Sequence, residues 1–292
     1  MSVTQFTGCR IGFIGAGRVA TALARAFSLA GERVVLVHAR TQASAQSLAG
    51  RVDGCRAATS AQQVADGAEL VFLAVPDDAI GPLASSLRWR AGQGVVHCSG
   101  GADLDVLATA RGSGAEVGSF HPLQMFSEPE AALKGLAACA IAVEAGPALV
   151  DELIRLVGLL GARALHVPQG RRAAYHAASH YAAAFLCVLL EEGTSILQAI
   201  DIDRDQARRA LLGLARGALD AIERDTPARA MAGVYARGDT GMAERHLEAL
   251  HALGEDVAGL YKTLAERSIR MALAEGRITS ERADLMRRLL QD

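Results

Sequence analysis

Two stretches of this largely apolar sequence place histidines where they could hold or transfer a proton. Pro122 biases His121 towards an extended backbone, so the imidazole would project from the end of a strand. His176, Ser179 and His180 are spaced i, i+3 and i+4, which places them on one face of a helix. Because histidine titrates near neutrality, it suits a general acid or a hydrogen-bond donor to a reacting oxygen. We therefore predict catalytic roles for His121, His176, Ser179 and His180.

Each of these groups also has a structural interpretation. His121 could bond a loop carbonyl, and the helical patch could be bonded within a dimer interface. His176 and His180 have the spacing of a two-histidine metal site, but the glutamate of His-Glu-x-x-His is missing and no third ligand is evident, so no metal is predicted. Arg237, just before the natural helix cap Asp239, could bind a substrate carboxylate or pair with an acidic neighbour. We include it among the candidate catalytic residues.

A glycine-rich turn near the N-terminus offers the other half of a reaction site. It follows a short apolar run at 11–14 and opens an amphipathic helical pattern. Gly15 permits the tight turn, Gly17 lets a diphosphate approach the backbone, and Ala20 lets the helix pack against the strand. The helix amides and the positive end of its dipole would bind the phosphates; a β-turn-α unit without a ligand is the alternative. The predicted dinucleotide-binding residues of this turn are Gly15, Ala16, Gly17, Arg18 and Val19.

The end of the next strand distinguishes the two nicotinamide dinucleotides. An NAD site usually carries an acidic residue about 20 residues after the glycines to bind the ribose hydroxyls, and no acid stands there. Arg40 could instead pair with a 2′-phosphate, and His38 and Thr41 could add hydrogen bonds. We predict NADP rather than NAD as the cofactor; the alternative is that Arg40 is only a solvated surface cation.

The elements that must position these groups follow from the hydrophobic pattern. Buried strands alternate with helices up to a break at 168–170, which predicts an α/β domain over residues 1–168 with a doubly wound, Rossmann-type sheet. Helical patterns beyond it, the first over 172–200, predict an all-helical domain for substrate binding and dimerisation over residues 169–292. In such a sheet the fourth strand lies beside the first, so the turns after the fourth and fifth strands should line the cofactor crevice. The predicted cofactor contacts in these turns are Ala74, Val75, Pro76, Asp77, Ser99 and Gly100.

The composition excludes several classes of protein. With 292 residues, 51% of them hydrophobic, the chain is long enough for two domains with sizeable cores. A net charge of −2 without a basic run argues against nucleic acid as a partner. Five widely spread cysteines without a Cys-x-x-Cys pair suit reduced thiols in a cytoplasmic protein, and residues 1–8 lack a secretory core.

One predicted helix is apolar on nearly all sides from Ala182 to Leu190. This run is too short to cross a bilayer, so no membrane association is predicted. A helix of this kind must be enclosed by other protein. Because a small helical domain is more easily enclosed by a second subunit than by itself, we predict a homodimer formed through the C-terminal helices.

With these residues in hand, the chain resembles the 6-phosphogluconate-dehydrogenase-like group of NADP-binding reductases. It is most similar to a branch described as Rossmann-like proteins with a helical C-terminal domain of unknown function. The resemblance implies a cofactor cleft that is closed by the helical domain of a dimer. The motifs that carry it are Gly-Phe-Ile-Gly-Ala-Gly-Arg-Val at 12–19, Val-Pro-Asp-Asp at 75–78, His-Cys-Ser-Gly at 97–100, Phe-His-Pro-Leu-Gln at 120–124, Tyr-His-Ala-Ala at 175–178 and Ala-Arg-Gly-Asp at 236–239.

Relatives in the wider group include ketopantoate reductases, pyrroline-5-carboxylate reductases, prephenate dehydrogenases and deazaflavin-dependent NADP reductases. In several of them a lysine, with an asparagine four residues on, serves the reaction from the first long helix. His176 and His180 hold that place here, so lysine chemistry does not carry over. His121 and Pro122 resemble the histidine-proline pair of prephenate dehydrogenases, in which the histidine contacts the reacting oxygen. Residues 232–235 read Ala-Gly-Val-Tyr where the branch would have Gly-Pro, so the pocket wall could differ.

These features together predict an NADPH-dependent reductase of a small 2-oxo acid or a related carbonyl compound, with ketopantoate as the first candidate. Hydride would pass to the carbonyl carbon while His176 or His121 donates a proton, and Arg237 would hold the substrate carboxylate. Two alternatives stay open: a dehydrogenase of a prephenate-like hydroxy acid, and a dinucleotide-sensing protein without turnover.

Overall fold

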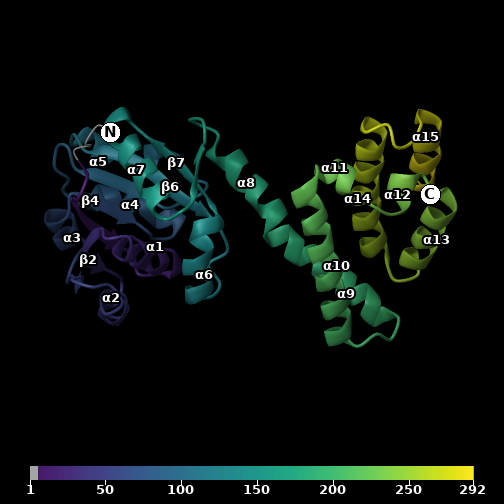
Figure 1. Ribbon diagram of the computed structural model, residues 1–292, viewed down its shortest axis with the longest axis horizontal. Coiled ribbons are helices and arrows are strands. Elements are labelled where there is room, and N and C mark those ends of the chain that lie inside the picture. Colours follow the sequence, from purple (N-terminus) through teal and green to yellow (C-terminus); the bar gives the residue numbers. More distant parts are fainter. Residues whose placement is uncertain (1–5, 292) are drawn as a thin grey trace. The chain divides into compact units, whose positions relative to one another are not determined.

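The structure is a computed structural model that describes residues 6–291 (Figure 1). It divides into two compact units, of which the first ends at Ala183 and the second begins at Ala184. The first unit runs past the predicted domain boundary at residue 168, because the next helix is fastened to the sheet. Arg172 in that helix donates from Nη1 to Ser119 Oγ at 2.7 Å.

The first unit is built on one eight-stranded sheet with the strand order β3-β2-β1-β4-β5-β6-β7-β8. The strands from β1 to β6 run parallel, β7 runs antiparallel to β6, and β8 runs parallel to β7. Because β4 lies beside β1, this order confirms the prediction of a doubly wound sheet. The strands are β1 (Arg10–Ile14), β2 (Arg33–His38), β3 (Arg56–Ala57), β4 (Leu70–Leu73), β5 (Gly94–His97), β6 (Glu116–Leu123), β7 (Ala140–Ala145) and β8 (Arg163–His166).

Helices pack against both faces of this sheet. Neighbouring residues of a strand point to opposite faces. Phe13 of β1 packs with Phe27 of α1, whereas Ile14 belongs to the apolar cluster that contains Val64 of α3. The helices of the first unit are α1 (Arg18–Leu29), α2 (Gln42–Ala49), α3 (Ala61–Gly67), α4 (Asp77–Ser86), the 3₁₀ helix η1 (Leu104–Leu107), α5 (Ala108–Gly112), α6 (Pro129–Gly135), the 3₁₀ helix η2 (Leu136–Ala138), α7 (Pro147–Leu159) and α8 (Arg172–Ala182).

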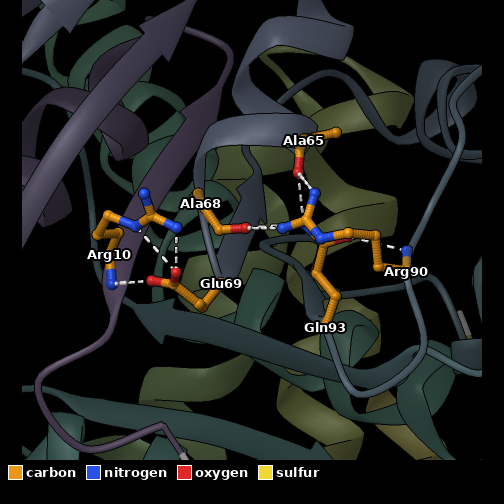
Figure 2. Close-up of polar contacts among 6 residues, drawn as sticks. All are labelled: Arg10, Ala65, Ala68, Glu69, Arg90 and Gln93. Atoms are coloured by element: carbon orange, nitrogen blue, oxygen red, sulfur yellow. Dashed lines mark hydrogen bonds and ion pairs between the residues drawn. The ribbon is translucent and has the colours of Figure 1, made fainter.

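Polar side chains fasten the edge of the sheet where the parallel strands begin (Figure 2). Arg90 donates to the carbonyl oxygens of Ala65 and Ala68 at 2.7 Å each. Gln93, which is nearly fully buried, donates to the same two oxygens at 2.6 and 2.9 Å. These carbonyls stand at the end of α3 and lack partners within the helix, so both side chains cap it. This edge therefore has a structural role, and it lies opposite the edge that carries the candidate site.

A second contact in the same view joins the start of β1 to the start of its neighbour β4. Figure 2 shows Arg10 at the start of β1 paired with Glu69, which immediately precedes β4. The Arg10 backbone N also donates to Glu69 Oε2, at 2.6 Å. The pair is exposed to solvent, so it aligns the strand ends but adds little to stability.

The second unit is entirely helical over residues 184–291, as predicted. Asp239 caps a helix as predicted, and Asp203 and Thr226 cap two others: each side chain accepts a hydrogen bond from the first turn of the helix that follows. The helices are α9 (Ala184–Ala199), α10 (Arg204–Arg224), α11 (Pro227–Ala230), α12 (Val234–Arg237), α13 (Thr240–His251), α14 (Glu255–Ala274) and α15 (Ser280–Leu289).

The predicted single helix over 172–200 is wrong in one respect. Ala183 has φ −122° and ψ −81°, outside the helical region, and this residue separates α8 from α9. The residues of α9 that the sequence required to be enclosed stay exposed within this chain: Phe185 is 45%, Val188 49% and Leu189 41% exposed. By length and composition alone, the stretch 172–199 could cross a membrane, with a mean hydropathy of 1.3. The same composition suits a helix that another protein chain covers.

Candidate active site

The carboxyl ends of β1, β4, β5 and β6 meet at one edge of the sheet, beside the point where the strand order reverses. The turn after β1 is closed by a hydrogen bond from Gly15 N to the His38 carbonyl oxygen, at 2.8 Å. The turn after β4 begins at Ala74, whose N donates to the Ile14 carbonyl oxygen at 2.8 Å, and it leads into α4. The predicted cofactor contacts Ala74, Val75, Pro76 and Asp77 therefore adjoin the glycine turn.

The two glycines of this turn fit the predicted diphosphate. Gly15 has φ +111°, and a Cβ there would lie 2.1 Å from the Ala74 carbonyl oxygen, so only glycine can occupy the position. Gly17 is the N-cap of α1; a Cβ there would meet no atom within 4 Å, and no side chain caps the helix. The first-turn amides of α1 have no acceptor within the helix, and no acidic side chain lies in that turn. Open space in front of bare amides is what a bound diphosphate requires.

The side chains that would distinguish NADP from NAD lie at the start of α1 and after β2. Arg18 and Arg40 are exposed, and neither guanidinium has a hydrogen-bond or ion-pair partner within residues 6–291. Thr41 caps α2, its Oγ1 accepting from Ser44 N at 3.3 Å. His38 is half-buried, with Nδ1 3.3 Å from the Ala58 carbonyl oxygen, so its ring is already engaged. Of the predicted 2′-phosphate contacts, Arg40 is therefore the most available, and Arg18 is equally available to a phosphate group.

A pocket of about 480 Å³ lies beside the glycine turn, between α1 and α2. Sequence reasoning placed Ala16, Gly17 and Arg18 at a cofactor but did not include the α2 residues that face them. Hydroxyl groups and a second guanidinium on this wall suit a phosphorylated ligand. The pocket is lined by Ala16, Gly17, Arg18, Thr21, Ala43, Ser44, Ser47, Leu48 and Arg51.

His121 lies near the carboxyl end of β6, where the sequence placed it. Its Nδ1 is 2.8 Å from the hydroxyl oxygen of Tyr175, and the two rings meet edge to face with centroids 5.7 Å apart. The ring of His176 also meets His121 edge to face, at 6.1 Å. The two histidine stretches that the sequence singled out therefore come together, but Tyr175 joins them as a residue that the sequence did not assign.

The turn after β5 lies against both histidine rings. A Cβ on Gly100 would be 2.7 Å from His176 Cδ2 and 2.8 Å from His121 Cε1, so a side chain there would displace both rings. Ser99 shapes this turn, because its hydroxyl accepts from Gly101 N at 3.2 Å and from Ala102 N at 3.0 Å. Ser99 and Gly100, which the sequence assigned to the cofactor, thus also fix the positions of the candidate catalytic rings.

The polar patch on α8 shares one face, as its spacing predicted. The rings of His176 and His180 are 4.9 Å apart. Ser179 Oγ donates to the His176 carbonyl oxygen at 2.6 Å, and His180 Nδ1 lies 3.0 Å from the same oxygen. These bonds return to the backbone of the helix itself. Within this unit His176 is the member of the patch that contacts His121.

Arg172 was not predicted as part of the site. It is fully buried, and beside its bond to Ser119 it donates from Nη2 to the Ser99 carbonyl oxygen at 2.8 Å. Its Nη1 also lies 3.5 Å from Glu144 Oε2. From sequence alone, an arginine that opens an alanine-rich helix is expected at the surface. Its three buried partners come from distant segments and are seen only in the fold. It anchors both α8 and the turn that carries Gly100.

His121 and His97 are held neutral near pH 7. Burial, followed by the charges of Arg172 and His176, lowers the pKa of His121 to about 4, while Asp77 opposes the shift. Burial, followed by Arg172 and His121, lowers the pKa of His97 to about 3. A neutral imidazole in positive surroundings is a hydrogen-bond donor to a developing negative charge, and not a pre-charged acid.

Arg237 lies in the other unit, exposed at the end of α12. Within residues 6–291 no acidic side chain pairs with it. Asp239 caps α13 by accepting from Met242 N at 3.0 Å. Within the same residues no group of three or more metal-ligating side chains comes together.

Comparison with known proteins gives two family matches. Residues 2–122 match the Rossmann-like domain family, and residues 139–268 match the family described as a domain of unknown function, DUF2520. No curated protein matches the sequence.

Three solved structures illustrate the likeness in fold. A protein from Bacteroides fragilis, named as an NADP oxidoreductase, is 24% identical with a TM-score of 0.73, over 90% of this chain and 98% of that one. A Thermotoga maritima protein is 22% identical with a TM-score of 0.75, over 91% and 99%. A reductive aminase from Aspergillus terreus, in complex with NADPH and ethyl levulinate, is 18% identical with a TM-score of 0.68, over 95% and 98%.

Proposed function

We propose that this chain, which joins a Rossmann-like domain to a DUF2520 domain, is an NADPH-dependent reductase of a small carbonyl compound. The observation that carries the proposal is the carboxyl edge of the sheet. There the uncapped amides of α1 and the guanidinium of Arg40 lie near one part of the edge, and the pair of His121 and Tyr175 near another. The names of two similar structures, an NADP oxidoreductase and a reductive aminase bound to NADPH, support the same cofactor.

Each part of this edge has a task in such a reaction. The amides at Gly17 would hold the diphosphate, and Arg40 would hold the 2′-phosphate. When bound, NADPH supplies a hydride to an electrophilic carbon. His121 would donate a hydrogen bond to the substrate oxygen and supply the proton that this oxygen needs, with His176 beside it as the second candidate donor.

The charges around His121 favour a carbonyl over a protonated imine. Burial is the main cause of the lowered pKa of His121; Arg172 and His176 add to the shift, and Asp77 opposes it by less. Positive surroundings stabilise the negative charge that develops on a carbonyl oxygen, and they disfavour an iminium cation. We therefore keep a small 2-oxo acid as the first substrate class, with ketopantoate as the first candidate. Arg237 is the candidate residue to bind the carboxylate of this acid. An imine is the second class, because the reductive aminase is among the similar structures.

The test combines binding with turnover. Calorimetry with NADPH and NADH measures which dinucleotide the protein prefers. A panel of ketopantoate, other 2-oxo acids and cyclic imines with NADPH, and of prephenate with NADP, is then followed by nicotinamide absorbance. Oxidation of NADPH by a 2-oxo acid supports the proposal. Tight NADPH binding without turnover of any compound would instead support the sensing alternative, and reduction of NADP by prephenate would support the dehydrogenase.

Arg40→Ala tests the choice of cofactor. A hydrogen-bonded charge pair is worth about 1.5–3 kcal/mol, so NADPH affinity should fall roughly 10- to 100-fold while NADH affinity stays within about twofold. The matched control is Arg33→Ala, an exposed arginine at the opposite end of the same strand. Equal losses of NADPH affinity in the two variants, measured by calorimetry, would remove Arg40 from the cofactor site.

We also propose a homodimer through the helical unit. The apolar face of α9 is exposed, and α10, α11 and α14 border an apolar pocket of about 700 Å³. A second copy would cover both surfaces with the same surfaces of its own. Sedimentation should therefore give the mass of two chains at micromolar concentration. Val188→Asp, on the exposed face of α9, should shift that mass towards one chain, and a wild-type monomer would refute the proposal.

A further inference from the structure

We propose that Tyr175 is the positioning residue of His121: its hydroxyl fixes the tautomer that presents Nε2–H to the substrate, and it replaces the proton that Nε2 gives away. The role in turnover rests on the proposed function, whereas the tautomer can be observed without any substrate.

The first step is which nitrogen is available. His121 Nδ1 is occupied by the Tyr175 hydroxyl at 2.8 Å. Nε2 has no hydrogen-bond partner within residues 6–291, and it lies 2.9 Å from the position that a Cβ on Gly100 would take. Among these residues Nε2 is unpaired without being fully buried, so a ligand can reach it. A substrate oxygen would therefore meet Nε2 and not Nδ1.

The second step is the direction of the hydrogen bond. His121 is neutral near pH 7, and burial raises the pKa of the Tyr175 phenol, so the phenol keeps its proton. The charged groups that act on this pair are Arg172 and His176 on α8 and Asp77 on α4. The Arg172 guanidinium makes the nearby phenol O–H a better donor and the imidazole a poorer base. With Nδ1 accepting from Tyr175, the single ring proton of neutral His121 stays on Nε2.

The third step is what holds the phenol. Arg172 lies over the Tyr175 ring, with Cζ 5.9 Å from its centroid. The two residues are three apart on α8, so they share a face of the helix. Since Arg172 is itself fixed by Ser119 and by the Ser99 carbonyl, the Tyr175 hydroxyl has little freedom to leave His121.

The proton balance follows from this arrangement. As the carbonyl carbon accepts hydride, the electron pair of its C=O bond moves to oxygen, and the oxygen takes the proton of His121 Nε2. Nδ1 then takes the proton of the Tyr175 hydroxyl, so the imidazole is neutral again and the charge rests on the phenolate beside Arg172. To restore the starting state, Nε2 takes a proton from solvent and Nδ1 returns its proton to the phenolate. The net proton consumed comes from water.

The wild-type protein gives the first test, by ¹⁵N NMR of its histidine side chains at pH 7.5. The signals of His121 are identified by their loss in His121→Asn. The nitrogen shifts should report an Nε2–H tautomer, and in Tyr175→Phe they should become a mixture of tautomers. An Nδ1–H tautomer in the wild type would overturn the proposal whether or not the protein turns any compound over.

Turnover gives the second test. Tyr175→Phe should lower kcat about 10- to 50-fold, below the roughly 100-fold contribution of a complete acid catalyst, and leave the calorimetric affinity for NADPH unchanged. The matched control is Tyr181→Phe on the same helix, at a side chain that is 75% exposed. Wild-type kcat in Tyr175→Phe would overturn the proposal. If the wild type oxidises no NADPH with any compound of the panel, the proposed function fails, and the tautomer alone decides the role of Tyr175.

Discussion

Replacing Gly100 with alanine is expected to lower turnover of the proposed reaction at least about 100-fold. The new Cβ would stand 2.7 Å from His176 Cδ2 and 2.8 Å from His121 Cε1, distances that side-chain atoms do not tolerate. His121 is held in β6 and His176 in α8, and Arg172 fixes the turn itself by its bond to the Ser99 carbonyl oxygen. The rings must therefore move, and a misplacement of about 1 Å in a reaction site costs roughly 100-fold in rate.

The measurement is kcat with the best substrate of the panel, together with the thermal midpoint of unfolding. Gly112→Ala is the matched control, because a Cβ at Gly112 meets no atom within 4 Å. If Gly100→Ala keeps the wild-type kcat, the rings of His121 and His176 are not part of the reaction.

Acid is expected to destabilise the sheet unit through two histidines. His97 and His121 have pKa values of about 3 and 4 in the folded protein, against 6.5 as the ordinary value. The unfolded chain therefore binds protons between pH 6.5 and 4 that the folded chain does not, so the free energy of unfolding falls as pH falls through this window. Between pH 7.5 and pH 5 each histidine should remove about 2 kcal/mol of stability.

Urea unfolding at the two pH values measures this loss. The only tryptophan, Trp89, is buried in the same unit and donates from Nε1 to the Ala84 carbonyl oxygen at 2.8 Å, so its fluorescence reports that unit. Carboxylates also contribute to acid unfolding, and His97→Gln isolates the histidine part. In this variant the amide oxygen can replace the acceptor that His97 Nδ1 offers to Ser99 N. If His97→Gln loses as much unfolding free energy between pH 7.5 and pH 5 as the wild type, then His97 is already protonated in the folded protein at pH 5.

The sheet and the glycine turn were predictable because they depend on local pattern. Apolar runs, glycines and cap residues act within a few residues of themselves; Ser60, for example, caps α3 by accepting from Gln63 N at 3.1 Å. The prediction that β4 lies beside β1 followed from the topology of doubly wound sheets and is confirmed. The identity of the cofactor and the roles of individual residues stay predictions.

The rest of the site depends on contacts between distant segments. Tyr175 stands beside His176 in the sequence, yet its bond to His121 spans 54 positions and has no local pattern. The burial of Arg172 depends on Ser119 and Glu144, which sit on two other strands. Likewise, the break at Ala183 falls inside a continuous helical pattern. These features are products of tertiary packing, which overrides local preference.

The run of β6 beside β7 has a consequence for how such a chain can change in evolution. Residues 118–122 and 141–145 are paired residue by residue, but they belong to the two different family matches. An exchange of gene segments at the family border would separate β6 from its hydrogen-bonded partner β7 and leave the backbone groups of both strand edges unpaired. Recombination that keeps the sheet whole is therefore expected to join new sequence beyond Ala183, where the first unit ends, and not at the border between the two matches.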